Sequence, residues 1–294
     1  MALLMAASSP ATADPLSLPA FIQSIHPVKA DARIAYGPGT SQWADLYLPK
    51  DPGPHPVVML VHGGCYSASV PAESTSQIAA DLAGHGVAVW NVEYRRLGEP
   101  GGGYPGTFQD IAAAADRLRL EAPARHLDLT RVVAVGHSAG ASLALWAASR
   151  GKLPAQSPLR TQGPLRIPTV ILLAGTGDLK ASAGVIQLGC SNVPRINALV
   201  GSPSATRQDA FSDTSPRELL PLGVRTVSIV GVYDDNYPPY IDLAWRQAAR
   251  ASGDPAEAVV LPDVGHYDVV AVDVPTWAIV RERILGEIRA LPGN

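Results

Sequence analysis

The chain of 294 residues has little charge, few aromatic side chains and only two cysteines. Charged residues make up 17% of it and the formal net charge is −3, so the sequence offers no basic surface for nucleic acid. No apolar run reaches the about 18 residues that a membrane-spanning helix needs, which argues against a membrane anchor. Internal repeats and low-complexity tracts are also missing, which excludes a solenoid.

Hydrophobic residues, by contrast, account for 47% of the chain, which is typical of a globular protein with one sizeable core. Apolar runs typical of buried strands alternate along the chain with stretches typical of helices. This alternation predicts an α/β fold with a mostly parallel, doubly wound sheet. The expected strands are 57–61, 86–92, 132–135, 167–173, 224–230 and 259–261, and the expected helices are 72–84, 111–121, 141–148 and 277–290.

Three local patterns complete this expectation. Alternating patches over residues 21–49 favour an antiparallel opening hairpin. Thr107 followed by Asp110 resembles a capping box before helix 111–121. The periodicity weakens over residues 176–221, and so long a segment inside an α/β domain favours a cover over the active site. We therefore expect one α/β domain over residues 21–294 with a cover insertion.

Residues 1–20 are expected to be a signal or a disordered terminus. Residues 2–7 are mostly apolar, and Ala11-Thr12-Ala13 resembles the Ala-x-Ala cleavage site of a secretory signal. The apolar run is short and no basic residue precedes it. We expect an exported protein, periplasmic or secreted, with a truncated or atypical signal, and a cytoplasmic protein is the alternative.

The segment 132–140 carries the main chemical motif. A β-branched run leads into Gly136-His137-Ser138-Ala139-Gly140, and helix-prone residues follow, which is typical of a strand, a tight turn and a helix. Such a turn would expose the hydroxyl of Ser138 above a sheet edge, and the two glycines would leave room for the backbone. The motif predicts a serine nucleophile.

A serine hydroxyl is a poor nucleophile unless a base removes its proton and a third group orients that base. Both kinds of residue follow Ser138 in the sequence. Expected strand 224–230 runs into a turn with Asp234 and Asp235, and His266 lies on a loop after strand 259–261. The order nucleophile, acid, histidine is that of an α/β-hydrolase.

The chain resembles bacterial members of the α/β-hydrolase superfamily. It is similar in particular to the esterases grouped with kynurenine formamidase, the bifunctional feruloyl/acetyl-xylan esterases and the hormone-sensitive-lipase-like enzymes. The resemblance covers about residues 35–290 and is carried by several motifs in the same order. These are residues 46–49, 62–66, 91–96, 104–107, 136–140, 231–235 and 265–266.

This resemblance implies the roles of the catalytic residues. Ser138 would be the nucleophile, and His266 the general base and then the general acid. Asp234 would be the orienting carboxylate, because the family places it three residues after the glycine that ends the strand, here Gly231. Asp235 is the alternative.

The resemblance also implies an oxyanion hole, in which backbone N–H groups stabilise the negative charge that develops on the substrate carbonyl. The donors would be Ala139, Gly64 and Cys65. Cys65 stands where the lipase-like group has a third glycine, and Tyr66 where the formamidase group usually has tryptophan. The shape of the acyl pocket therefore does not follow from the family.

The two cysteines, Cys65 and Cys190, fall in the expected oxyanion segment and the expected cover. Either a disulfide bridge, which would suit an exported protein, or two free thiols fits the sequence. His62 is expected to hold the oxyanion segment by hydrogen bonds. No cluster of His, Asp or Glu at metal-ligand spacing accompanies it, so we expect no metal site.

The leading hypothesis is a serine hydrolase that cleaves small-molecule carboxylic esters through an acyl-enzyme on Ser138, without a cofactor. One alternative is amide cleavage by an arylformamidase or an enzyme of the prolyl-oligopeptidase type. Another is a non-catalytic binding protein on the same fold. Acyl and alcohol specificity and the oligomeric state do not follow from the sequence.

Overall fold

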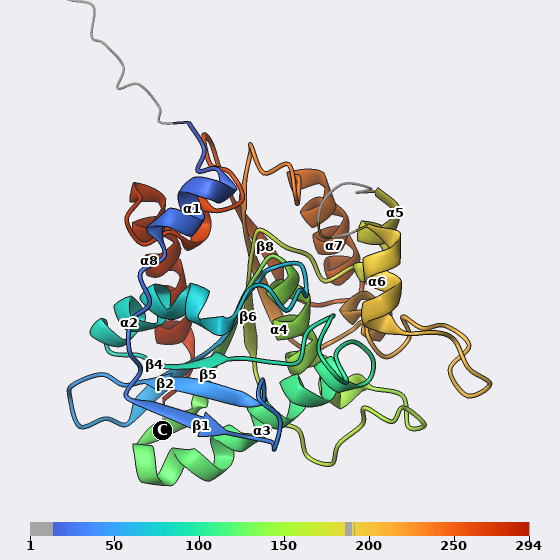
Figure 1. Cartoon of the computed structure of the whole chain (residues 1–294), viewed down its shortest axis with the longest axis horizontal. Coiled ribbons are helices and arrows are strands. Elements are labelled where there is room, and N and C mark those ends of the chain that lie inside the picture. Colours follow the sequence, from blue (N-terminus) through green and yellow to red (C-terminus); the bar gives the residue numbers. More distant parts are fainter. Residues whose placement is uncertain (1–13, 186–189, 191, 294) are drawn as a thin grey trace, which may run out of the picture.

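The computed structural model describes residues 14–185, 190 and 192–293 (Figure 1). The apolar segment and the Ala-x-Ala pattern that predict a secretion signal lie within residues 2–13, outside the described residues. Export of the protein therefore stays a prediction.

The molecule is built on one sheet of eight strands in the order β1-β2-β4-β3-β5-β6-β7-β8. β2 pairs antiparallel with β1 and with β4, and the other neighbours are parallel. This arrangement confirms the predicted α/β fold and its mostly parallel sheet. The strands are Ala32–Ala35 (β1), Trp43–Tyr47 (β2), His55–Val61 (β3), Ala88–Val92 (β4), Leu127–His137 (β5), Thr169–Leu173 (β6), Arg225–Gly231 (β7) and Ala256–Leu261 (β8).

The central strands form where the sequence has continuous apolar runs. Every residue of β3, β4 and β6 is buried, because helices cover both faces of the sheet there. α2 (Ser76–Gly84) and α8 (Pro275–Ala290) pack on one face, and α3 (Gly106–Arg125), α4 (Ala139–Ser149) and α7 (Pro239–Ala251) on the other (Figure 1). None of the described helices is long and apolar enough to cross a membrane.

The segment between β6 and β7, predicted to be a cover, holds α5 (Leu179–Val185), α6 (Val193–Val200) and a short 3₁₀ helix (Pro216–Leu219). The side chain of Asn192 caps α6 by accepting a hydrogen bond from the backbone N–H of Arg195. In Figure 1 α6 lies on the same side of the molecule as α7. The cap fixes the first turn of α6, which carries Arg195.

The predicted capping box at Thr107 and Asp110 is wrong. Helix α3 begins at Gly106, five residues before the predicted start, and no side chain caps it. The hydroxyl of Thr107 donates to the carbonyl of Arg95 and accepts from the N–H of Gly103, while Asp110 forms an ion pair with Arg95. Both side chains therefore hold the preceding loop rather than the helix end.

The opening stretch 21–49 contains the predicted hairpin, β1 and β2, but it begins inside a helix that the alternating pattern did not reveal. This helix, α1 (Leu18–Ser24), is capped by the hydroxyl of Ser17 and has a proline in its first turn. α7 was not predicted either. α1 lies beside the loop that follows the carboxyl end of β8, where ligand sites of such sheets are found, and α7 packs on one face of the sheet.

Candidate active site

Ser138 lies in the turn between β5 and α4, with φ 52° and ψ −121°, a conformation that residues other than glycine rarely adopt. A Cβ atom on Gly136 would overlap the carbonyl oxygen of Gly140. A Cβ atom on Gly140 would overlap the carbonyl oxygens of Val61 and His62. The close approach of the backbone thus requires both glycines of the motif, and the predicted strand, turn and helix are present.

The structure brings Ser138, His266 and Asp234 together at the carboxyl ends of β5, β8 and β7. His266 Nε2 lies 3.0 Å from Ser138 Oγ, and His266 Nδ1 lies 2.9 Å and 3.0 Å from the two carboxylate oxygens of Asp234. The three residues are only 2%, 5% and 2% exposed, respectively. Asp235, the alternative carboxylate, is exposed, and the carboxylate that His266 Nδ1 contacts is that of Asp234.

The loops around these residues hold the histidine and the carboxylate in place. Asp234 accepts hydrogen bonds from the backbone N–H groups of Asn236 and Tyr237 at 3.0 Å and 2.8 Å. The ring of Tyr237 stacks on His266, and the ring of Tyr267 meets it edge-on. Burial and the charge of Asp234 raise the pKa of Tyr267, so its hydroxyl stays neutral. The imidazole therefore has one defined orientation.

His137, which precedes Ser138, packs against the imidazole of His266. Its Nε2 lies 3.1 Å from the carbonyl oxygen of His266, so it can donate to that oxygen. Burial, followed by the neighbouring imidazole of His266, lowers the pKa of His137 to about 3. His137 is therefore a neutral support beneath the loop of His266.

His62 begins the predicted oxyanion segment and is completely buried. Its Nδ1 lies 2.8 Å from the carbonyl oxygen of Gly63 and its Nε2 lies 3.0 Å from Glu93. Glu93 also pairs with Arg96 at 3.2 Å. Burial raises the pKa of Glu93, but the contact with His62 and the charge of Arg96 outweigh burial and lower it. The contacts of His62 are those of a structural support. Among the residues described, no three metal-ligating side chains form a cluster.

The three predicted oxyanion donors surround Ser138. Ala139 begins α4 directly after it, and Gly64 and Cys65 line the same hollow as its side chain. Gly64 and Cys65 both have positive φ, 100° and 58°, so their backbone turns sharply at this point. Cys65 is joined to Cys190 by a disulfide bridge, the first of the two possibilities that the sequence left open. The bridge ties the segment that follows His62 to the cover.

A hollow of about 320 Å³ opens above Ser138 and His266, and most of its wall is apolar. Sequence reasoning missed two parts of this wall. The first is α1, which contributes Leu18, Phe21 and Ile22; Phe21 stacks on Tyr267 with 5.1 Å between ring centroids. The second is Arg195 at the start of α6. A serine followed by a proline at 17–19 signals α1, but nothing local to either segment signals its contact with the site.

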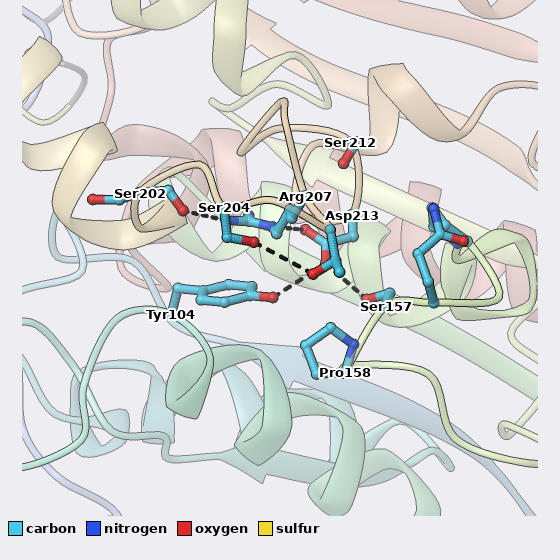
Figure 2. A pocket seen from close by; sticks show the side chains of 11 residues that line it. Tyr104, Ser157, Pro158, Ser202, Ser204, Arg207, Ser212 and Asp213 are labelled. Atoms are coloured by element: carbon cyan, nitrogen blue, oxygen red, sulfur yellow. Dashed lines mark hydrogen bonds and ion pairs between the residues drawn. The ribbon is translucent and has the colours of Figure 1, made fainter.

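A second hollow, of about 220 Å³, lies between the cover and the loop after α4 (Figure 2). Most of the residues that line it have polar side chains. Arg207 forms an ion pair of 2.6 Å with Asp213, and Asp213 also accepts hydrogen bonds from Tyr104 and Ser157. Figure 2 shows these side chains converging on Asp213. This second hollow, which we call the polar hollow, contains none of the predicted site residues.

The chain is similar to known proteins in sequence and in structure. Residues 44–239 match the model of the BD-FAE family, and no curated protein matches the chain. An inhibited esterase B from Lactobacillus rhamnosis superposes with a TM-score of 0.77 at 20% identity, over 93% of this chain and 91% of that one. A truncated carbohydrate esterase from gut microbiota superposes with a TM-score of 0.71 at 18% identity, over 90% of this chain and 97% of that one.

A bifunctional GH43-CE protein of Bacteroides eggerthii is also similar, with a TM-score of 0.71 and 22% identity over 87% of this chain. The match covers 35% of that longer protein. Likeness at this level of identity shows a shared fold, the α/β-hydrolase fold, whereas the family model covers more than half of the chain. The protein therefore belongs to the BD-FAE family.

Proposed function

We propose that the protein is a serine hydrolase that cleaves carboxylic esters through an acyl-enzyme on Ser138. The observation that carries this proposal is the hydrogen-bonded chain of Ser138, His266 and Asp234 at the base of the hollow. Membership of the BD-FAE family supports it, as do similar structures whose names describe them as esterases.

Acylation begins when His266 Nε2 takes the proton of Ser138 Oγ as that oxygen attacks the ester carbonyl carbon. Negative charge then develops on the carbonyl oxygen, where the backbone N–H groups of Ala139, Gly64 and Cys65 would stabilise it. Asp234 stabilises the imidazolium and keeps Nδ1 protonated. The C–O bond breaks, and His266 returns the proton to the departing alkoxide, which leaves as an alcohol.

Deacylation repeats these steps with water. His266 Nε2 removes a proton from the water molecule as its oxygen attacks the acyl carbon. The second tetrahedral intermediate collapses, the acid leaves, and the proton on His266 returns to Ser138 Oγ. The enzyme is regenerated, and these steps use only groups of this chain.

The hollow supports the proposal that the substrate has an apolar part. Leu18, Phe21 and Ile22 of α1 form one side of it and Val70 another. Its volume fits a small acyl or aryl group. Within the esters, we propose esters of sugars as the substrates, because a similar structure is named a carbohydrate esterase. Esters of feruloyl and acetyl groups with sugars, and N-formylkynurenine, would be compared in a second round.

Export of the protein is part of the proposal. The bridge between Cys65 and Cys190 supports it, because disulfide bonds form and persist in oxidising compartments. Cell fractionation with mass analysis of the mature protein tests this separately from activity. Recovery of the protein from the cytoplasm with residue 1 still present would contradict export.

The test of the activity is hydrolysis of 4-nitrophenyl acetate, butyrate and octanoate by the purified protein, beside Ser138→Ala and His266→Ala. We expect turnover of the shorter esters and a loss of about 10³-fold or more in both variants. The matching 4-nitroanilides are measured in parallel. Faster cleavage of the anilides would favour an amide hydrolase, and activity that survives Ser138→Ala would contradict the mechanism.

A further inference from the structure

Arg195 has an unusual place among the residues that line the active-site hollow. It lies in the first turn of α6 and lines the same wall as Cys65 and Cys190. Of the described residues around this hollow it alone carries a fixed charge, because the rest are apolar, hydroxyl-bearing or histidine. A charged group in an otherwise apolar pocket is the kind of feature that fixes the orientation of a ligand.

The hydrogen bonds of Arg195 use one side of its guanidinium group. Nη1 donates to the carbonyl oxygen of Cys65 at 2.9 Å, which holds the group in place. Nε is buried and has no hydrogen-bond partner in the described part of the chain. Nη2 has no partner there either, and neither has the group an ion-pair partner. The edge formed by Nε and Nη2 is therefore without an acceptor.

That edge is the one with which arginine binds carboxylates, through two parallel N–H···O bonds. Arg33 shows the same geometry in this protein, because its Nε and Nη2 each donate to one oxygen of Asp45 at 2.8 Å. Arg95 uses Nε and Nη2 in the same way to bind Asp110. At Arg195 the donors are present and held in place, but none of the residues that the structure describes supplies a carboxylate to them.

We propose that Arg195 binds a carboxylate of the substrate, so that the enzyme prefers esters with an anionic group over neutral esters of the same size. This inference rests on the proposed function, because it assigns a substrate class to the same site. One carboxylate would supply the missing acceptors of Nε and Nη2 and neutralise the single fixed charge of the hollow. The hydrogen bond to Cys65 makes the guanidinium a fixed contact point beside the oxyanion segment.

Two pairs of substrates test the proposal, and in each pair one member carries a carboxylate that the other lacks. Mono-4-nitrophenyl glutarate and 4-nitrophenyl pentanoate place the difference on the acyl side. 4-Acetoxybenzoate and phenyl acetate place this difference, the carboxylate, on the leaving group. For the wild type we expect a higher kcat/KM for the anionic member of at least one pair, and the pair that responds shows on which side of the scissile bond Arg195 acts.

The variants are Arg195→Gln, Arg195→Lys and, as a matched control, Lys180→Gln. Lys180 is an exposed cation of the same cover, outside the hollow, and pairs with Asp209. Arg195→Gln is expected to lower the ratio of anionic to neutral kcat/KM by about 10- to 100-fold, the range of a hydrogen bond to a charged group. Arg195→Lys keeps the charge but lacks the planar edge, so its ratio should lie between those of the wild type and Arg195→Gln. Lys180→Gln should leave the ratio unchanged.

A purely structural role for Arg195, through its bond to Cys65, would lower both members of a pair equally. An unchanged ratio in Arg195→Gln therefore overturns the proposal, and so does a neutral preference of the wild type in both pairs. Ser138→Ala supplies the blank for the spontaneous hydrolysis of the glutarate ester.

Ser138→Ala also separates this inference from the proposed function. Titration calorimetry measures its binding of mono-4-nitrophenyl glutarate, 4-nitrophenyl pentanoate, 4-acetoxybenzoate and phenyl acetate, with and without Arg195→Gln. If the wild type hydrolyses no ester, yet Ser138→Ala binds an anionic member more tightly and this preference depends on Arg195, the carboxylate site is supported and the esterase is contradicted. Hydrolysis of neutral esters by the wild type without any preference for anionic ones would support the esterase and contradict the carboxylate site.

Discussion

The active-site hollow and the polar hollow each contain an arginine, and the surroundings of these two arginines differ. Arg207 in the polar hollow pairs with Asp213 (Figure 2). It also donates to the carbonyl oxygen of Val200 and lies over the ring of Tyr104. Among the described residues, the guanidinium group of Arg195 in the active-site hollow has one partner, the carbonyl oxygen of Cys65, and its Nε–Nη2 edge has none. A charge whose donors are all satisfied stabilises the fold, whereas a charge with free donors in a pocket is available to a ligand.

The largest expected effect falls on the active-site hollow. Asp234→Asn should lower kcat about 10⁴-fold, because asparagine does not hold His266 in the tautomer whose Nε2 accepts the serine proton. The melting temperature should change little, since the amide oxygen can still accept from the backbone. Steady-state kinetics with 4-nitrophenyl butyrate measure this. Asp235→Asn is the control and should retain activity; loss of activity there alone would exchange the roles of the two carboxylates.

A substitution in the polar hollow should lower the stability of the protein and leave its activity nearly unchanged. Asp213→Ala leaves Arg207 buried without its counter-ion and should cost about 3–5 kcal/mol of stability. Urea denaturation measures the loss, and kcat/KM of the folded fraction should stay near that of the wild type. The double variant Asp213→Leu with Arg207→Met should recover much of the stability. A large loss of activity without a loss of stability would contradict the structural role of this ion pair.

The disulfide bridge joins the active-site hollow to the cover, and its removal should affect both stability and activity. Cys65→Ser with Cys190→Ser should lower the free energy of unfolding by about 2–4 kcal/mol. We also expect slower ester hydrolysis, because Cys65 belongs to the predicted oxyanion segment. Treatment of the wild type with a reductant should reproduce both changes. Alkylation of two thiols in the unreduced, unfolded wild type would show that the bridge is absent.

The smallest effect concerns His137 beneath the active-site hollow. Because the pKa of His137 is about 3 in the folded protein, the unfolded chain takes up a proton there below about pH 6.5 that the folded protein does not. The stability from this group is present above pH 6.5 and falls by about 1.4 kcal/mol per pH unit as the pH drops towards 3.

Urea denaturation between pH 7 and pH 4 measures the slope for the wild type and for His137→Gln, which should be flatter. His85→Gln, at a partly exposed position on the surface, is the control and should keep the slope of the wild type. An unchanged slope in His137→Gln would assign the acid sensitivity to another group.

The parts of the fold that the sequence predicted are those governed by short-range patterns. The strands β3, β4 and β6 are continuous apolar runs because helices cover them on both sides, and such runs are visible in the sequence. The turn at Ser138 was visible because backbone contacts exclude a side chain at Gly136 and Gly140. The order of the residues after Ser138 predicted which side chains the sheet brings together.

The missed features depend on contacts between distant segments. Arg195 meets Cys65 across 130 positions, and no local pattern distinguishes it from a surface arginine on an amphipathic helix. The capping pattern at Thr107 misled because the preceding loop competes for the same side chain. α1 carried a usable signal in Ser17 and the following proline, but its place over the hollow rests on the stack of Phe21 with Tyr267.

Helix α1, which forms one wall of the active-site hollow, lies far along the chain from Ser138, Asp234 and His266. Leu16 donates its backbone N–H to Asp268, which also accepts from Gly265, so the first described residues are anchored to the loop that carries His266. The wall that we expect to select the size of a substrate is thus encoded more than a hundred positions before Ser138. A library confined to residues 14–25 could redesign chain-length preference while leaving every reacting group unaltered.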